Sequence, residues 1–127
     1  MKRIELLKQD MDKVIKEIFM IAIDILGGPK KLVEYKRLTW LASLMEAIFV
    51  IYLHNEENQS ADEIAEFLGI SSQTAKAILQ SKPEYAKIKL ESGESSEKTH
   101  IAGGIAKIAY KKWKEENEKG SMSHQEA

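Results

Sequence analysis

The side chains best suited to molecular recognition in this chain lie between residues 71 and 82. A glutamine such as Gln73 can make a bidentate pair with adenine, and a lysine such as Lys76 can bind guanine or a phosphate. Serine hydroxyls and helix N-termini can also hold a backbone phosphate. If these residues share one helix, they predict a DNA-contacting face made of Ser71, Ser72, Gln73, Lys76, Ala77 and Gln80.

Two short helices would position this face. Ser60 followed by Glu63 is a capping-box pattern, so a first helix should begin at the residue after the serine. Gly69 supplies the tight or left-handed backbone that ends this helix, and Ser71 is placed to cap a second one. The positions that would face inward are Ile64, Ala65, Leu68, Ala75, Ile78 and Leu79. The pattern predicts a helix-turn-helix at residues 60–80, the geometry that presents its second helix to a DNA major groove.

A long amphipathic helix is predicted before this motif, over residues 2–26. Apolar residues recur along it every three or four positions, as in the seam of a coiled coil. The seam could pack on the core of its own domain, or it could join two chains. Because it is longer than a small helix-turn-helix body can cover, we expect residues 1–28 to form a dimerisation arm. The seam consists of Ile4, Leu7, Met11, Val14, Ile18, Ile21 and Ile25.

The next segment is predicted to form the centre of the core. Gly27-Gly28-Pro29 ends the first helix and starts another, and residues 30–54 continue in a helical pattern. From Leu38 to Leu53 the chain is apolar almost all round, as in a helix buried on several sides. This run is shorter than the roughly 20 residues that a bilayer requires and contains Glu46, so we expect no membrane span.

Residues 84–101 are open to two interpretations. The alternation from Lys87 to Glu91 fits the first strand of a short wing hairpin. The second strand of such a hairpin is poor, which favours a short helix followed by a flexible loop.

A last helix is predicted over residues 101–118, followed by a disordered tail at 119–127. Ala102, Gly103 and Ala106 give this helix a small-residue patch that another helix could approach closely. Its lysines form a stripe that is either a solvated face or a contact for DNA phosphates. Lys82, which follows the motif, is predicted to contact the DNA backbone together with the stripe of Lys107, Lys111 and Lys114.

These elements predict an all-α protein with an N-terminal arm at residues 1–28 and a helix-turn-helix domain at 29–118. A hydrophobic fraction of 43% is enough for a packed core. The high charged fraction of 31% would suit a thermophile. The N-terminus mixes charges and lacks the apolar run of a signal peptide, which predicts a cytoplasmic location.

Several kinds of chemistry find no support in the sequence. With no cysteine, the chain can form neither a disulfide nor a thiolate metal site. The three histidines, His54, His100 and His124, lack the spacing of a metal site. We therefore expect no catalytic residues, no metal and no cofactor.

Residues 40–81 resemble region 4 of bacterial sigma factors and the LuxR-type response-regulator domain. The likeness is carried by Glu63-Ile64-Ala65-Glu66, Leu68-Gly69-Ile70-Ser71, Thr74, Lys76 and Leu79, and by the apolar helix before the motif. This resemblance implies a helix-turn-helix fold and DNA binding.

The longer pattern from Gly27 to Leu41, together with that from His100 to Ala106, resembles a family of small predicted regulatory proteins. That family is associated with thermophilic archaea and bacteria and with partner proteins related to the KaiC ATPase. This second resemblance implies a signalling role beside a RecA-like ATPase and contributes no catalytic residues.

Two functions follow as hypotheses. The first is a homodimeric regulator of transcription or signalling that binds double-stranded DNA. The net charge of −1 argues against it, because DNA-binding proteins usually carry a basic excess. The second is a protein-interaction adaptor that does not bind DNA and acts with a regulatory ATPase such as a KaiC-like protein.

Overall fold

The computed structural model describes the backbone of residues 2–34, 41–86 and 98–126, and the side chains of residues 10–33, 41–86 and 101–118. Most of these residues are helical and none of them lies in a strand, which confirms the predicted all-α class. The wing hairpin considered for residues 84–101 lies mainly outside the described residues.

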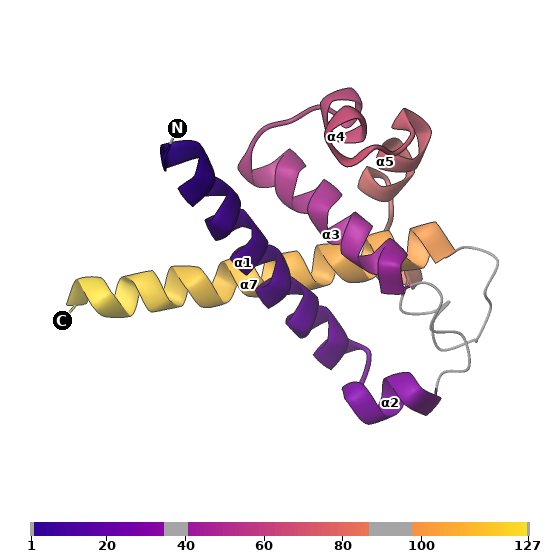
Figure 1. Cartoon of the computed structure of the whole chain (residues 1–127). Helices are drawn as coiled ribbons and strands as arrows, with labels where there is room; N and C mark the ends of the chain where they lie inside the picture. The colour runs from indigo at the N-terminus through magenta and orange to yellow at the C-terminus, as the bar shows by residue number, and fades with distance from the viewer. Residues whose placement is uncertain (1, 35–40, 87–97, 127) are drawn as a thin grey trace.

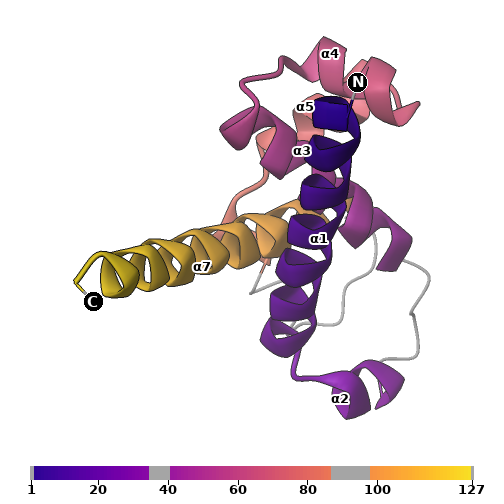
Figure 2. The ribbon, with the colours of Figure 1, turned by 60° about the vertical axis from the view of Figure 1, so that its left-hand side comes forward.

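Two long helices cross and a pair of short ones sits beside them (Figure 1). Figure 2 shows that the C-terminal part of α7 extends away from the other helices. In chain order the helices are α1 (Lys2–Ile25), α2 (Pro29–Glu34), α3 (Leu41–Glu56), α4 (Ala61–Leu68), α5 (Ser72–Leu79) and α7 (Lys98–Glu126).

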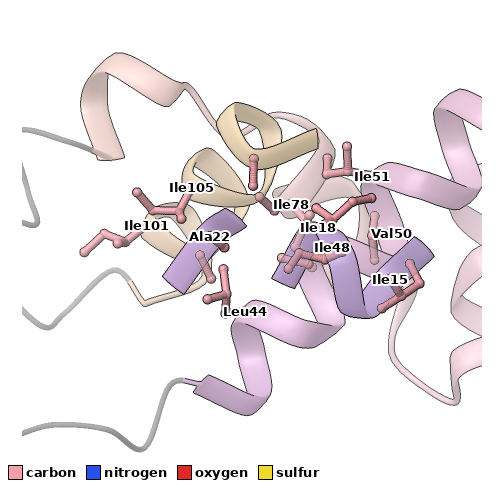
Figure 3. Close-up of a cluster of buried hydrophobic side chains, with 14 of the residues drawn as sticks. Ile15, Ile18, Ala22, Leu44, Ile48, Val50, Ile51, Ile78, Ile101 and Ile105 are labelled. Atoms are coloured by element: carbon pink, nitrogen blue, oxygen red, sulfur yellow. The ribbon is translucent and has the colours of Figure 1, made fainter. Parts of the chain in front are cut away.

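Helix α3 lies at the centre of the core. It contacts α1, α4, α5 and α7, so few of its faces reach solvent. Leu44, Ile48 and Ile51 are at most 1% exposed and meet Ile18 of α1 and Ile105 of α7 in one apolar cluster (Figure 3). This burial confirms the sequence interpretation of α3 as a core helix. Within the described residues, no helix combines the length and the apolar character needed to cross a bilayer.

The apolar seam of α1 packs within the same chain. Ile18 is fully buried, and the side chains on either side of it lie partly buried against the core formed with α3 and α7. The structure therefore shows the intramolecular alternative for this part of the seam, namely Met11, Val14, Ile18, Ile21 and Ile25. The side chains of Ile4 and Leu7 lie outside the described ones, and the homodimer stays a prediction.

Two glycines turn the chain after α1. Gly27 and Gly28 have φ angles of 106° and 89°, in the left-handed region that favours glycine. The amide of Gly28 donates to the carbonyl of Ile23 over 2.9 Å, which satisfies the end of the helix. The predicted helix stop is confirmed.

Helix α7 approaches the segment after α5 very closely, because two of its residues have no side chain. A Cβ atom added to Gly103 would fall on the Oγ of Ser81 and lie 3.1 Å from the carbonyl oxygen of Ile78. A Cβ atom on Gly104 would overlap Ala86 and lie 3.0 Å from the carbonyl oxygen of Lys82. The predicted small-residue patch is therefore a contact between helices, and it includes Gly104 as well as the predicted residues.

The backbone of α7 is helical to Glu126, beyond residue 118 where the sequence pattern predicts an end and a disordered tail. Residues 119–126 contain no proline to stop the helix. Lys119, Gln125 and Glu126 favour a helix, although Gly120 does not.

The close approach at Gly103 predicts the effect of one added methyl group. We expect Gly103→Ala to lower the free energy of unfolding by about 1–2 kcal/mol. Overpacking costs about 1–3 kcal/mol, of which the better helix propensity of alanine returns at most about 1 kcal/mol. Urea unfolding followed by circular dichroism measures the change.

A double variant identifies the contact responsible. Ser81→Gly removes the side chain that the new methyl group would strike, so Gly103→Ala should cost less in the Ser81→Gly background. Strictly additive effects of the two substitutions would show that Ser81 is not the obstacle.

Candidate nucleic-acid interface

Side-chain and backbone caps fix the ends of α4. The Oγ of Ser60 accepts from the amide of Glu63 over 3.2 Å, and Glu63 Oε1 accepts from the amide of Ser60 over 3.0 Å. This bond holds the pKa of the Glu63 carboxyl below its usual value. At the other end Gly69 adopts a φ of 73°, and its amide donates to the carbonyl of Ala65 over 2.9 Å. The predicted capping box and glycine stop are both confirmed.

Helices α3, α4 and α5 pack against one another as a compact unit. Ile64 and Ala65 of α4 and Ala75 and Ile78 of α5 are buried, as the inward-facing pattern predicts. The inner face of α5 is therefore fixed by packing, and its opposite face points away from the core.

The outward face of α5 carries a polar stripe. Gln73, Lys76 and Gln80 are exposed, and their spacing of three and four residues aligns them along one side of the helix. Ser72 and Ala77 flank the stripe and are half-buried. Lys76 makes no hydrogen bond or ion pair within the described part of the chain. The structure thus brings five of the six predicted base-contacting residues to one surface.

Ser71 is exposed but is occupied as the N-cap of α5. Its Oγ accepts from the amide of Thr74 over 3.0 Å and lies 2.8 Å from the Thr74 hydroxyl oxygen. Its role is to hold the first turn of α5 in place rather than to present a free hydroxyl.

Lys107 fixes the other end of α5. Its Nζ donates to the carbonyl oxygens of Leu79 and Ser81 over 2.5 Å and 2.7 Å, although Lys107 lies 28 and 26 residues later in the chain. A cation at this position satisfies helix-end carbonyls and complements the negative end of the helix dipole. Burial lowers the pKa of the Lys107 ammonium group. The Lys107 ammonium group, predicted to contact a phosphate, contacts two backbone carbonyls in this structure, and the phosphate contact stays a prediction.

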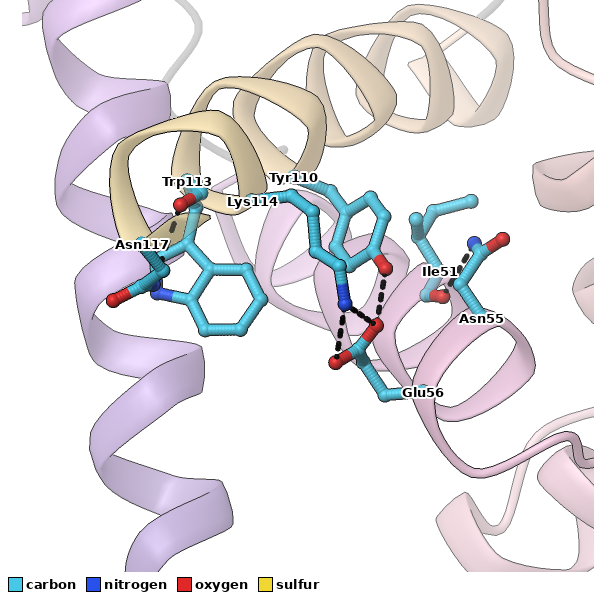
Figure 4. A network of polar contacts seen from close by, with 7 residues as sticks. All are labelled: Ile51, Asn55, Glu56, Tyr110, Trp113, Lys114 and Asn117. Atoms are coloured by element: carbon cyan, nitrogen blue, oxygen red, sulfur yellow. Dashed lines mark hydrogen bonds and ion pairs between the residues drawn. The ribbon is translucent and has the colours of Figure 1, made fainter. Parts of the chain in front are cut away.

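Lys114 is also engaged inside the molecule. Its Nζ lies 2.8 Å and 3.0 Å from the two carboxylate oxygens of Glu56, and the hydroxyl of Tyr110 donates to the same carboxylate over 2.5 Å (Figure 4). Trp113 packs edge-on against Tyr52 and donates to Glu17. We call Glu56, Tyr110 and Lys114 the Glu56 clasp, because they join the end of α3 to α7.

Lys82 and Lys111 differ from these two lysines. Both are exposed, and neither makes an ion pair or hydrogen bond with any described residue. Of the four predicted backbone contacts, these two keep a free ammonium group. The periodicity that aligned the lysines of α7 gave no information on which of them would reach another helix.

Within the described part of the chain, no three His, Cys, Asp or Glu side chains lie close enough together to hold a metal ion. His54 lies with its Nδ1 3.0 Å from the carbonyl oxygen of Gln59, at the turn that leads to α4.

No protein-family model matches the chain, and no curated protein or solved structure shows significant similarity to it. The function must therefore be inferred from the geometry of its own residues.

The Glu56 clasp predicts a stability component that depends on pH. Burial raises the pKa of the Glu56 carboxyl, but the hydrogen bonds from Lys114 and Tyr110, together with the charge of Lys114, outweigh it and leave the pKa below its usual value. The clasp should therefore stabilise the fold fully above the unfolded-state pKa of about 4.3, and lose this effect as pH falls through the lower folded-state value.

Glu56→Gln tests the clasp. Because the pair is partly exposed, we expect a loss of only about 0.5–1 kcal/mol near neutral pH, and a smaller loss near pH 3. Urea unfolding at both pH values measures it, with Glu57→Gln, which alters an exposed neighbouring carboxylate, as the control. An equal loss at both pH values would contradict the assignment.

Proposed function

We propose that this protein binds double-stranded DNA by placing the exposed stripe of α5 in the major groove. One observation carries the proposal: Gln73, Lys76 and Gln80 project from a helix whose two ends are capped by Ser71 and Lys107. A helix held in this way presents its side chains without a large cost of ordering on binding. The resemblance of residues 40–81 to sigma-factor region 4 and LuxR-type domains agrees with this function.

Two side chains of the stripe have defined roles in the proposed complex. Gln73 makes a bidentate pair with adenine, and Lys76 contacts guanine or a phosphate. Lys82, just beyond α5, contacts the backbone. With about two phosphates neutralised, the logarithm of the binding constant should fall with the logarithm of salt concentration with a slope of about −2.

Acidic residues limit the affinity. Asp62, Glu63 and Glu66 are exposed on α4 and would repel a DNA backbone that passed over that helix. The DNA must therefore approach from the side of α5. A homodimer, which would present two stripes to neighbouring half-sites, needs a contact surface other than the buried part of the α1 seam.

A second function, a protein-interaction adaptor acting with a regulatory ATPase, is favoured by a different observation. Phe67 on α4 is 53% exposed beside the acidic residues of the same helix, whereas the ammonium groups of Lys107 and Lys114 already contact groups of the chain itself. An exposed aromatic side chain with charged neighbours is a common centre of protein–protein contacts. The second family resemblance, which involves KaiC-like ATPases, agrees with this alternative.

Charge reversal on α5 tests the DNA proposal. Wild-type protein should bind a fluorescent nonspecific duplex at low salt, with an anisotropy change that is lost as salt rises. Lys76→Glu should weaken binding by about tenfold or more, because it replaces an attractive contact with a repulsive one. Lys13→Glu makes the same change in net charge on the exposed side of α1. Its binding should stay within about twofold of the wild type.

The opposite results are equally informative. Wild-type protein that fails to bind the duplex at low salt would overturn the DNA proposal. Calorimetric binding to a KaiC-like ATPase, lost in Phe67→Ser, would then support the adaptor.

A further inference from the structure

An open groove lies beside the end of α5, between the helical turn at residues 83–86 and the middle of α7. Its volume is about 490 Å³, within the range of small-molecule sites. Pro83 and Ile108 supply apolar surface, and Lys107, Lys111 and Lys112 supply three ammonium groups. The 83–86 turn covers α7 at Gly104, and the groove opens where α7 continues past that turn.

The groove carries three lysines against two carboxylates, Glu84 and Glu115. Lys107 and Lys111 are four residues apart, a spacing at which like charges on a helix repel each other. Lys111 and Lys112 are exposed and make no ion pair or hydrogen bond with the described residues, although Glu115 follows Lys111 by one turn. An anion seated beside these lysines would relieve this repulsion.

We infer that the groove is a binding site for a small amphipathic organic anion, with its apolar part against Pro83 and Ile108 and its phosphate, sulfonate or carboxylate held by Lys107, Lys111 and Lys112. The combination of apolar surface with a few charged side chains is typical of a small-molecule site. Glu84 and Glu115 line the same groove. A polyanion that ran along the whole groove would pass both carboxylates, whereas a small anion needs only the part beside the lysines. A small anion therefore fits the groove better than a DNA backbone does.

The site is connected to α5 by a shared residue. Lys107 lines the groove, and its ammonium group caps the carbonyls of Leu79 and Ser81. An anion that draws Lys107 toward itself weakens this cap, so that occupancy of the groove alters the last turn of α5. Any resulting change in DNA affinity rests on the proposed function. The binding of the anion and its effect on α5 are independent of that function.

Anilinonaphthalene sulfonate is a suitable probe, because it joins an apolar ring system to one sulfonate and fluoresces more strongly in an apolar site. Folded wild-type protein should bind it with a single saturable affinity. The double variant Lys111→Gln/Lys112→Gln should bind at least about tenfold more weakly, since two charge-assisted contacts are removed. A matched control, Lys13→Gln/Lys16→Gln, neutralises two exposed lysines of α1 and should bind as the wild type does.

Amide NMR spectra test the connection to α5. Saturation with the probe should shift the amide signals of Leu79, Gln80 and Ser81, and Lys107→Met should abolish most of that shift. Equal probe affinity of the wild type and the Lys111→Gln/Lys112→Gln variant would overturn the assignment. Displacement of the probe by a short DNA duplex would also overturn it, if that displacement requires Lys111 and Lys112. Lys76→Glu should bind the probe as the wild type does. The probe experiment therefore tests the groove even if the protein does not bind DNA.

Discussion

The orientation of α5 depends on how closely α7 can approach its C-terminal end. Gly103 and Gly104 bring the backbone of α7 against Ser81 and the turn that follows, where any side chain would strike its neighbours. That short separation allows the Lys107 ammonium to reach two carbonyls that would otherwise lack partners at the helix end. The absence of side chains at Gly103 and Gly104 and the hydrogen bonds of Lys107 therefore act together, because Lys107 reaches the carbonyls only when the backbones are this close.

The same helix is attached at a second point by the Glu56 clasp. Lys107 joins α7 to the end of α5, and the clasp joins it to the end of α3. Helices α3 and α7 also meet in the apolar cluster that includes Ile48, Ile51 and Ile105. Helix α7 thus holds the unit of α3, α4 and α5 in place, although it contributes no residue to the stripe.

Local features of this fold could be predicted from the sequence because they depend on neighbouring residues. Ser60 with Glu63, and Gly69, act through contacts spanning three or four positions, and the structure has them as predicted. The burial of α3 could also be predicted, since a helix that is apolar all round can only be a core or membrane helix.

Long-range contacts were not predictable in the same way. Periodicity places Lys107, Lys111 and Lys114 on one side of α7, but not which of them meets a carbonyl or carboxylate from a distant segment. The α1 seam illustrates the same limit, because three-four spacing fits its own α3 and α7 as well as a second chain. Only the positions of the other helices distinguish these outcomes.

The position of Lys107 in the chain also bears on how the protein is made. During synthesis α4 and α5 are complete before α7 exists, and their caps at Ser60, Gly69 and Ser71 are already in place. The cap on the last carbonyls of α5 comes from a lysine that is translated 28 residues after Leu79. A nascent chain can therefore form the helix pair early, but it gains the Lys107 cap only after the ribosome has released the first turns of α7.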